Sequence, residues 1–233
     1  MIILALDTAT PVTSVALLDD NQLLGQVSEP SKNHSRTLLI AIDRLVSQLG
    51  LARHDLGAIA VGLGPGSFTG IRVGLTLAKS LSFALRIPLA GVSTLRALAE
   101  NGKSQGAEWI CPALDALRNE VYSACYLERQ GSLSVVQAEA AREPHDWALE
   151  LSASGKKCLL LGSGVKRYPE IFEDQLGNSA IVVPEERLHV ISAVAIGFLA
   201  REKLQLGASD DPHKLEPMYC RLSQAELVRN SKM

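Results

Sequence analysis

Two aspartates occupy matching positions in the two halves of the chain. Asp7 ends the apolar run that opens the sequence, and Asp115 ends a similar run near its midpoint. Gly62 and Gly162 form a second matching pair, because each follows a later apolar run. If each half folds as one lobe, we expect one aspartate on each wall of the cleft between the lobes. Paired carboxylates in a cleft can hold a metal–nucleotide complex, so an ATP-dependent reaction is one interpretation of this pattern.

The residues that follow the two aspartates argue against that reaction. Backbone N–H groups can reach a phosphate only where the surrounding residues are small. Asp7 is followed by a threonine and an alanine, and Asp115 is followed by ALRNE at 116–120. Side chains of this size would crowd a phosphate, and the carboxylate of Glu120 would repel it. We therefore expect both aspartates to serve as hydrogen-bonding ends of strands.

The densest group of glycines lies in the segment 62–74, GLGPGSFTGIRVG. A glycine-rich loop ahead of a helix can bind an anion at the helix N-terminus. This segment has no lysine where the GxxxxGK[ST] loop requires one, and it departs from GxGxxG at Ser67 and from GxSxG at Pro65. The segment therefore matches neither nucleotide-binding motif, and it does not match the serine hydrolase motif.

Small residues also form a stripe on the helix expected after this loop. Gly70, Gly74 and Ala78 recur at every fourth position, and such a stripe lets another segment approach the helix closely. One interpretation is packing against the chain's own sheet, and the other is contact with a second subunit. The spacing favours neither. Under the second interpretation, we expect Gly74→Leu to abolish partner binding and to leave the fold intact.

The histidines and cysteines do not form a metal-binding pattern. The five histidines stand apart, and the four cysteines show no CxxC spacing. Both observations argue against a metal site. We therefore expect no cofactor, and we expect reduced cysteines in the core at Cys111, Cys125, Cys158 and Cys220.

Hydrophobic periodicity predicts the elements that must position these residues. In the first half we expect strands at 2–6, 12–18, 23–27, 58–61 and 89–92 and helices at 35–49 and 68–85. In the second half we expect strands at 109–114, 121–127, 133–136 and 158–161 and helices at 144–151, 168–175 and 192–206. Both halves follow the order strand-strand-strand-helix-strand-helix. This order predicts an α/β protein with a duplicated βββαβα unit, divided into lobes 1–103 and 104–233.

The composition indicates an extensive core and weak intrinsic attraction to nucleic acid. Of the 233 residues 47% are hydrophobic, and the net charge is −2. A protein that binds nucleic acid on its own usually has a strongly basic surface. No apolar segment reaches the ~20 residues of a membrane span, and the N-terminus lacks the basic region of a signal peptide. We expect a cytoplasmic protein without membrane contact.

Several segments closely resemble the bacterial TsaB (YeaZ) family. They are LALDTAT at 4–10, NHSRTLL at 33–39, GLGPGSFTGIRVGLTLAKSL at 62–81 and DALRNEVYSACY at 115–126. The segment EPMYCR at 216–221 resembles that family's P-x-Y-x-R terminus. The GPGSFTG element is the most specific of these segments, and the resemblance covers essentially the whole chain. It implies the two-lobed fold of actin, Hsp70 and the sugar kinases (the ASKHA fold), in agreement with the repeat.

The resemblance implies an accessory role in forming N6-threonylcarbamoyladenosine (t6A) at position 37 of tRNA. The family works with TsaD and TsaE, and TsaC makes the threonylcarbamoyl adenylate. TsaD has a paired-histidine HxxxH metal site, whereas here His34 is followed four positions later by Leu38. We therefore expect a non-catalytic, peptidase M22-like subunit that docks onto TsaD and activates it together with TsaE. The resemblance also implies that the same surface can form a homodimer when TsaD is absent. Because the basic residues form no extended patch and the aromatics are scattered, we expect tRNA contact only within the complex.

The resemblance assigns the partner interface to the helices at 35–49 and 68–85. The expected interface residues are His34, Ser35, Leu38, Leu39, Ile42, Leu45, Phe68, Gly70, Ile71, Gly74, Leu75 and Ala78. Active members of the superfamily have glycines and a Thr or Ser after each first-strand aspartate. The departure here implies a vestigial nucleotide cleft at Asp7, Thr8, Asp115, Gly162 and Gly164.

Two other functions remain as alternatives. The first is an autonomous ATP-dependent enzyme of the sugar-kinase type, which predicts ATP turnover by the isolated chain that falls in Asp7→Ala. The second is a protease acting on its partner, for which the sequence contains no constellation of catalytic residues.

Overall fold

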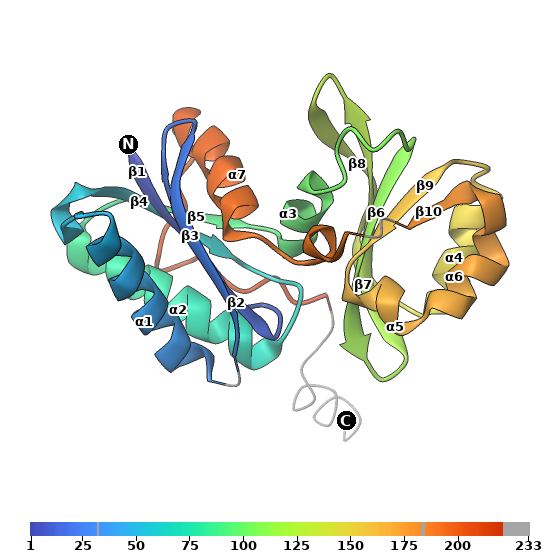
Figure 1. The fold of residues 1–233 in the computed structure, drawn as a ribbon, viewed down its shortest axis with the longest axis horizontal. Helices are drawn as coiled ribbons and strands as arrows, with labels where there is room; N and C mark the ends of the chain where they lie inside the picture. Colours follow the sequence, from blue (N-terminus) through green and yellow to red (C-terminus); the bar gives the residue numbers. More distant parts are fainter. Residues whose placement is uncertain (32, 183–184, 221–233) are drawn as a thin grey trace.

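The computed structural model describes residues 1–31, 33–182 and 185–220 of the chain. Two five-stranded sheets form its two lobes (Figure 1). The first sheet has the order β3-β2-β1-β4-β5 and the second the order β8-β7-β6-β9-β10. The first sheet contains β1 (Ile2–Asp7), β2 (Val12–Asp19), β3 (Gln22–Pro30), β4 (Leu56–Gly62) and β5 (Leu89–Val92). The second contains β6 (Trp109–Leu117), β7 (Glu120–Arg129), β8 (Ser132–Arg142), β9 (Cys158–Leu161) and β10 (Ala180–Val182).

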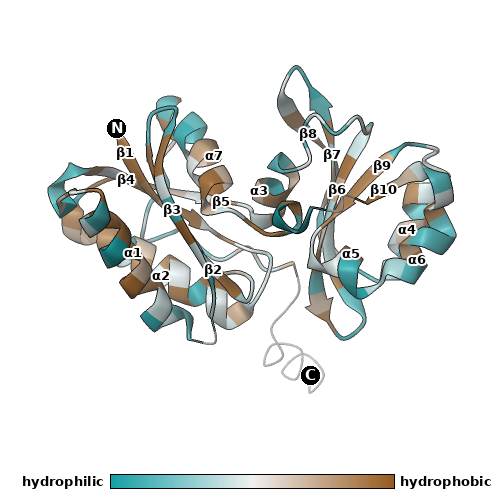
Figure 2. Ribbon diagram, in the orientation of Figure 1, coloured by the Kyte–Doolittle hydropathy of each residue, from teal (hydrophilic) through white to brown (hydrophobic). Residues whose placement is uncertain are grey.

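The two sheets share one topology, which confirms the predicted duplication. In each sheet the first three strands form an antiparallel meander. The last two strands run parallel to the first strand, which lies between the rest of the meander and them. β1 is the central strand of the first sheet and β6 that of the second. A central strand covered on both faces is apolar throughout, and residues 3–7 of β1 are all buried. In Figure 2 the central strands of both sheets are largely hydrophobic, whereas β8 at the edge of the second sheet also contains hydrophilic residues.

Helices α1 (His34–Gln48) and α2 (Phe68–Leu85) cover the outer face of the first sheet. The Asn33 side chain caps α1 by accepting from the N–H of Arg36, and the Ser67 side chain caps α2 by accepting from that of Gly70. Both caps agree with the sequence, since short polar side chains satisfy the free N–H groups of a first turn. The second lobe carries α4 (Pro144–Ala153), α5 (Ser163–Arg167) and α6 (Pro169–Leu176).

Two helices lie on the sides of the sheets that face each other (Figure 1). These are α3 (Thr94–Glu100), which packs on β6 and β7, and α7 (Ala193–Gln205), which packs on β1, β2, β4 and β5. One core cluster consequently contains residues of both lobes, among them Ile3, Leu98, Ile110 and Ile196. A Cβ at Gly197 would collide with Leu18, so this glycine lets α7 lie close to the first sheet. The division at 103/104 stays a prediction, and the packing of α3 and α7 crosses it.

The sequence analysis missed α3, α5 and β10, each of seven residues or fewer. In α3 five of the seven residues are buried, and the two charged residues, Arg96 and Glu100, are too few to give a helical period over so short a segment. A 3-10 turn follows α1 at Arg53–Asp55, and two more lie in the second lobe at Gly177–Ser179 and Glu186–His189. Among the described residues, no helix combines the length and apolar character needed to cross a membrane.

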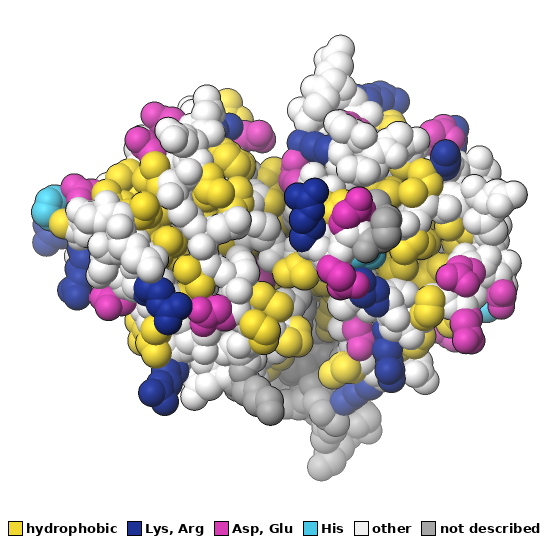
Figure 3. Space-filling view, in the orientation of Figure 1, with side chains coloured by type: hydrophobic (Ala, Val, Ile, Leu, Met, Phe, Trp, Pro, Cys, Tyr) yellow, Lys and Arg dark blue, Asp and Glu magenta, His cyan; other side chains and the backbone are white. Residues whose placement is uncertain are grey.

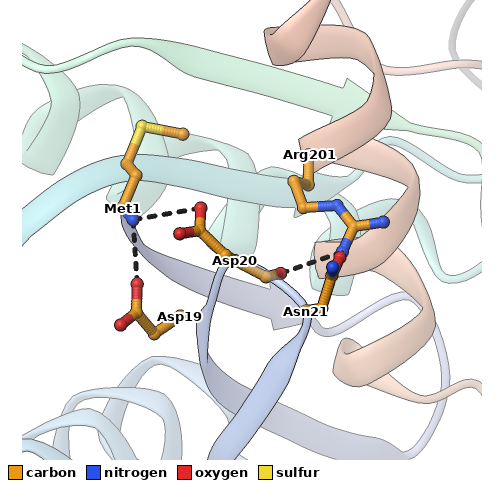
Figure 4. Close-up of polar contacts among 5 residues, drawn as sticks. All are labelled: Met1, Asp19, Asp20, Asn21 and Arg201. Carbon is orange, nitrogen blue, oxygen red and sulfur yellow. Dashed lines mark hydrogen bonds and ion pairs between the residues drawn. The ribbon is translucent and has the colours of Figure 1, made fainter.

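Polar contacts join the start of β1 and the middle of α7 to the turn between β2 and β3 (Figure 4). The Met1 ammonium donates to Asp19 over 2.8 Å and to Asp20 over 3.2 Å. Arg201 of α7 donates to the carbonyl oxygen of Asp20 over 2.9 Å and also to the side chain of Asn21. These groups are exposed, so the contacts define the position of the turn more than they stabilise the fold.

Candidate functional site

Asp7 is enclosed at the end of β1. Its Oδ2 accepts a hydrogen bond from the N–H of Ala9 over 3.1 Å, while Oδ1 faces Gly62, where a Cβ would collide with it. The side chain is fully buried, and this burial raises its pKa to about 7, although the N–H groups of Ala9 and Thr8 oppose the shift. Asp7 is thus enclosed by the N–H groups that follow it and by Gly62, and its place in a vestigial nucleotide cleft stays a prediction.

The glycine-rich loop packs on the turn between β1 and β2. The N–H of Ser67 donates to the carbonyl oxygen of Ala9 over 2.7 Å. The Thr8 hydroxyl donates to the carbonyl oxygen of Gly70, also over 2.7 Å. A Cβ at Gly66 would collide with the same Ala9 oxygen. The glycines therefore allow close contact between two loops of this chain, at the place where a phosphate cradle would need open backbone N–H groups.

The small-residue stripe on α2 faces inward. A Cβ at Gly70 would collide with the carbonyl oxygen of Thr8, and a Cβ at Gly74 would collide with the Thr8 hydroxyl. Ala78 is fully buried. The stripe thus packs against the chain's own sheet, which is the first of the two interpretations that the spacing left open. The expectation that Gly74→Leu leaves the fold intact is wrong, because the larger side chain has no room.

The expected interface residues divide into a buried and an exposed group. The residues that pack beneath the surface of α1 and α2 are Leu38, Leu45, Gly70, Ile71, Gly74, Leu75 and Ala78. His34 and Ile42 are half-buried. Ser35, Leu39 and Phe68 are exposed, with Leu39 55% and Phe68 39% accessible. Only the exposed and half-buried residues are available to touch a partner, and their role there stays a prediction.

The exposed residues line a groove between α1 and α2, which we call the α1–α2 groove. Its volume is about 560 Å³, and its lining residues are Ser35, Leu39, Phe68, Thr69, Arg72, Val73, Thr76, Leu77 and Ser80. In Figure 3, exposed hydrophobic side chains lie between the charged and other polar side chains of the first lobe. The sequence analysis missed Arg72, Val73, Thr76 and Leu77. Their spacing of four residues from Phe68 and Thr69 is a second stripe that could have indicated them.

His34 lies at the start of α1, beside this groove. Its Nδ1 is 2.9 Å from the hydroxyl of Thr13 on β2. Partial burial lowers the pKa of the imidazole, because the charged form loses hydration. The ring therefore ties α1 to the sheet as a neutral, hydrogen-bonded side chain.

A cavity of about 580 Å³ lies between the lobes. It is lined from the first lobe by residues 9–11 and 66–69, and from the second by residues 114–117, Tyr122 and Ser163. Asp115 is among these lining residues, whereas Asp7 is not. Asp115 therefore lines this cavity, whereas Asp7 is buried at the end of β1, and the assignment of both residues to a vestigial nucleotide cleft stays a prediction.

Gly162 and Gly164, which the sequence analysis assigned to the vestigial nucleotide cleft, also pack closely against other parts of the chain. Asp115 accepts from the N–H of Leu117 over 2.9 Å, and its own N–H donates to the Ser163 hydroxyl over 3.1 Å. A Cβ at Gly162 would collide with the carbonyl oxygen of Ala113, and Gly164 lies against β6 and β7. These residues hold α5 against the sheet.

No group of three or more histidine, cysteine, aspartate or glutamate residues in the described part of the chain could hold a metal ion. The cysteines are free thiols. Cys111, Cys125 and Cys158 are buried in the second lobe, and Cys220 is half-buried.

Comparisons with known proteins indicate one pathway. The family model described as TsaD, tRNA N6-adenosine threonylcarbamoyltransferase, matches residues 28–228. A Bacillus subtilis protein named tRNA threonylcarbamoyladenosine biosynthesis protein TsaB is 34% identical, over 97% of this chain and 96% of its own. The Escherichia coli protein of the same name is 30% identical, over 95% of each chain.

Solved structures agree with these relatives. The structure of YeaZ from Pseudomonas aeruginosa superposes with a TM-score of 0.79 at 30% identity, over 94% of this chain and 99% of that one. A hexokinase of the ROK family from Thermus thermophilus superposes with a TM-score of 0.53 at 14% identity, over 88% of this chain and all of that one. The second likeness concerns the fold alone, and it confirms the predicted two-lobed ASKHA architecture.

Proposed function

Because the chain belongs to the TsaB family of tRNA threonylcarbamoyladenosine biosynthesis proteins, we propose that it is a non-catalytic subunit that docks onto TsaD and activates it in t6A formation. The proposal includes TsaE as a second partner and the adenylate made by TsaC as the threonylcarbamoyl donor. It also includes a cytoplasmic location, tRNA contact only within the assembly and a homodimer when TsaD is absent.

The observation that carries the docking role is the α1–α2 groove. Leu39 and Phe68 are large apolar residues that remain exposed on it, beside Val73 and Leu77. Water contact with such a surface is unfavourable, and burial of apolar area in a complex removes this cost. The glycines on the inner face of α2 let the helix pack directly on the β1–β2 turn, and this packing fixes the position of the helix that forms one wall of the groove.

The state of the vestigial cleft supports a non-catalytic role. Asp7 is buried and faces Gly62. In the glycine-rich loop, the N–H of Ser67 and the carbonyl oxygen of Gly70 are already hydrogen-bonded to Ala9 and Thr8. If ATP were bound beside Asp7, the backbone groups of the glycine-rich loop would have to turn toward the phosphates. That turn would break the hydrogen bonds that hold the start of α2 against the β1–β2 turn. The interlobe cavity with Asp115 is the feature that keeps a sugar-kinase-type reaction as the alternative.

A pair of matched variants tests the proposal. Leu39→Glu places a charge in the α1–α2 groove, while Leu149→Glu places one on α4 of the other lobe, at a leucine of similar exposure, 45%. We expect Leu39→Glu to weaken TsaD binding at least tenfold, equivalent to about 1.4 kcal/mol, and to reduce t6A formation in a reconstituted reaction. Leu149→Glu should behave as the wild type.

Two results would contradict the proposal. One is t6A formation at the full rate when this chain is omitted from the reaction. The other is ATP turnover by the isolated chain that is lost in Asp7→Ala, which would favour the sugar-kinase-type alternative.

A further inference from the structure

The described C-terminal segment, residues 209–220, crosses the first lobe, and we call it the C-terminal strap. Near its start, Asp210 donates its N–H to Leu89 of β5 over 2.8 Å and accepts from the N–H of Gly91 over 2.7 Å. Near its end, Met218 donates its N–H to Leu63, which follows β4, over 2.8 Å. The strap is therefore fixed at both ends against the edge of the first sheet. This attachment brings Tyr219 to the N-terminal turn of α2.

Tyr219 and Phe68 hold the guanidinium group of Arg72. Phe68 and Arg72 are four residues apart on α2, and the Arg72 Cζ lies 3.7 Å from the centre of the Phe68 ring. The Nε of Arg72 donates to the Tyr219 hydroxyl over 2.8 Å. The two rings stack on each other at 5.1 Å between centroids. A cation over an aromatic face gains electrostatic attraction, so this arrangement fixes an otherwise flexible side chain.

The held guanidinium is oriented without being neutralised. Among the described residues, Arg72 has no ion pair, and its only hydrogen bond uses Nε. No described residue accepts a hydrogen bond from the terminal nitrogens. Arg72 lines the α1–α2 groove and also a neighbouring hollow of about 380 Å³ that contains Tyr219. None of the described residues that line the groove is an aspartate or a glutamate.

We propose that Arg72 binds a carboxylate that the TsaD-type partner presents from within an apolar part of its surface, and that Tyr219 is its positioning residue. This inference rests on the docking role proposed above and adds the chemistry of recognition. The planar guanidinium can donate two parallel hydrogen bonds to a carboxylate. Because the aromatic rings fix it beforehand, little side-chain entropy is lost when the partner binds. Arginine and tyrosine in apolar surroundings are the usual centres of binding energy in interfaces.

The charges of the groove favour a different protein over a second copy of this chain as the carboxylate donor. A twofold contact brings the same surface of both subunits together. Of the described residues, only Glu216 adds a carboxylate to the lining of the groove and the neighbouring hollow, and it shares the hollow with Lys79. Among these lining residues, a second copy docked through the groove could offer Arg72 only the carboxylate of Glu216, which already lies beside Lys79.

Affinity for TsaD, measured by calorimetry at low and at high salt, tests the inference. We expect Arg72→Gln to weaken binding ten- to hundredfold and to flatten the salt dependence, which a purely structural role would not change. Arg72→Lys keeps the charge without the planar fork and should weaken binding about three- to tenfold. Tyr219→Phe keeps the ring and removes the hydroxyl acceptor, so a loss of about two- to tenfold is expected. Arg129→Gln, on the other lobe, is the control and should bind as the wild type.

A charge exchange identifies the partner's carboxylate. Arg72→Glu should abolish binding, and replacement of one acidic residue of TsaD by arginine should restore it. Wild-type affinity and salt dependence in Arg72→Gln would overturn the inference while leaving the docking role intact. Loss of self-association in Arg72→Gln with unchanged TsaD binding would also overturn it, since the occupant would be a second copy. Absence of TsaD binding by the wild-type chain would instead overturn the proposed function.

Discussion

At the scale of single residues, burial decides what the most reactive groups can do. Asp7 has the residue type and the position of a catalytic carboxylate, yet the β1–β2 turn and Gly62 enclose it completely. Ionisation of a buried carboxyl group costs its hydration energy, and this raises the pKa of Asp7 to about 7. Burial therefore favours the neutral form of the Asp7 carboxyl group well above the pH at which an exposed aspartate ionises.

The raised pKa of Asp7 predicts a pH-dependent loss of stability. The folded state holds the Asp7 proton until the pH reaches about 7, whereas the unfolded state releases it near its ordinary value of 3.8. The free energy of unfolding should therefore fall as the pH rises from about 4 to about 7, since the native state binds more protons over this range. Asp7→Asn is neutral at every pH, and we expect its stability relative to the wild type to rise by roughly 2–4 kcal/mol across this range.

Urea unfolding of both proteins at a series of pH values measures this difference. Asp115→Asn is the control, because Asp115 lies in the open interlobe cavity. A stability difference between wild type and Asp7→Asn that stays constant from pH 4 to pH 8 would contradict the prediction.

At the scale of elements, α2 has two faces with different tasks. Gly70 and Gly74 let the helix lie directly against Thr8 of the β1–β2 turn and Ala78 is buried in the core, while Phe68, Arg72 and Thr76 face the groove. Residues four apart lie on the same side of a helix, so each stripe stays on one face along the helix. The C-terminal strap adds Tyr219 to the outer face from a position about 150 residues later in the sequence.

Because Asp210 attaches the strap to β5, we expect its substitution to destabilise the fold more than substitution of the neighbouring Asp211. The Asp210 carboxylate accepts from the N–H of Gly91 and pairs with Lys203 over 2.6 Å, and its side chain is mostly buried. We expect Asp210→Ala to lower the free energy of unfolding by about 1–3 kcal/mol, because the N–H of edge strand β5 loses a charged acceptor. Asp211→Ala is the control, since the contacts of Asp211 lie within the strap.

The same variants report on the docking surface. A loosened strap should position Tyr219 less well, so Asp210→Ala should also weaken TsaD binding by a few fold more than Asp211→Ala. Chemical denaturation and calorimetry measure the two effects separately. Equal stability of Asp210→Ala and Asp211→Ala would contradict the assigned role of the strap.

At the scale of the whole molecule, the lobes are joined by exchange of helices. The chain leaves the first lobe through α3, which packs on the second sheet, and it returns through α7, which packs on the first. Ile196 and Gly197 of α7 lie on β1 and β2 in the same core cluster that includes Ile110 of β6. Each sheet therefore depends on a segment from the other half of the sequence.

This exchange predicts that residues 1–103 do not fold cooperatively by themselves. Without α7, the face of the first sheet that contains Ile3, Ala5 and Leu18 would be exposed to water. We expect the fragment to show no sharp unfolding transition, and we expect a fusion of residues 1–103 with residues 190–220 through a flexible linker to recover one. Thermal and urea denaturation followed by circular dichroism distinguish the two states. A cooperative transition in the fragment alone would contradict the prediction.

The sequence by itself determined the duplicated unit, because the apolar periods of strands such as 2–6 and of helices such as 68–85 are local properties of the chain. It also showed that the glycine-rich segment 62–74 matches none of the phosphate-binding motifs. Only the tertiary structure decided which face of α2 is free, since the position of Gly74 against Thr8 depends on a contact across more than sixty residues. The same holds for Tyr219 beside Arg72 and for α7 on the first sheet. Contacts between distant segments produce no periodic pattern of hydrophobic residues in the sequence. They could therefore be identified only from the packing of the folded chain.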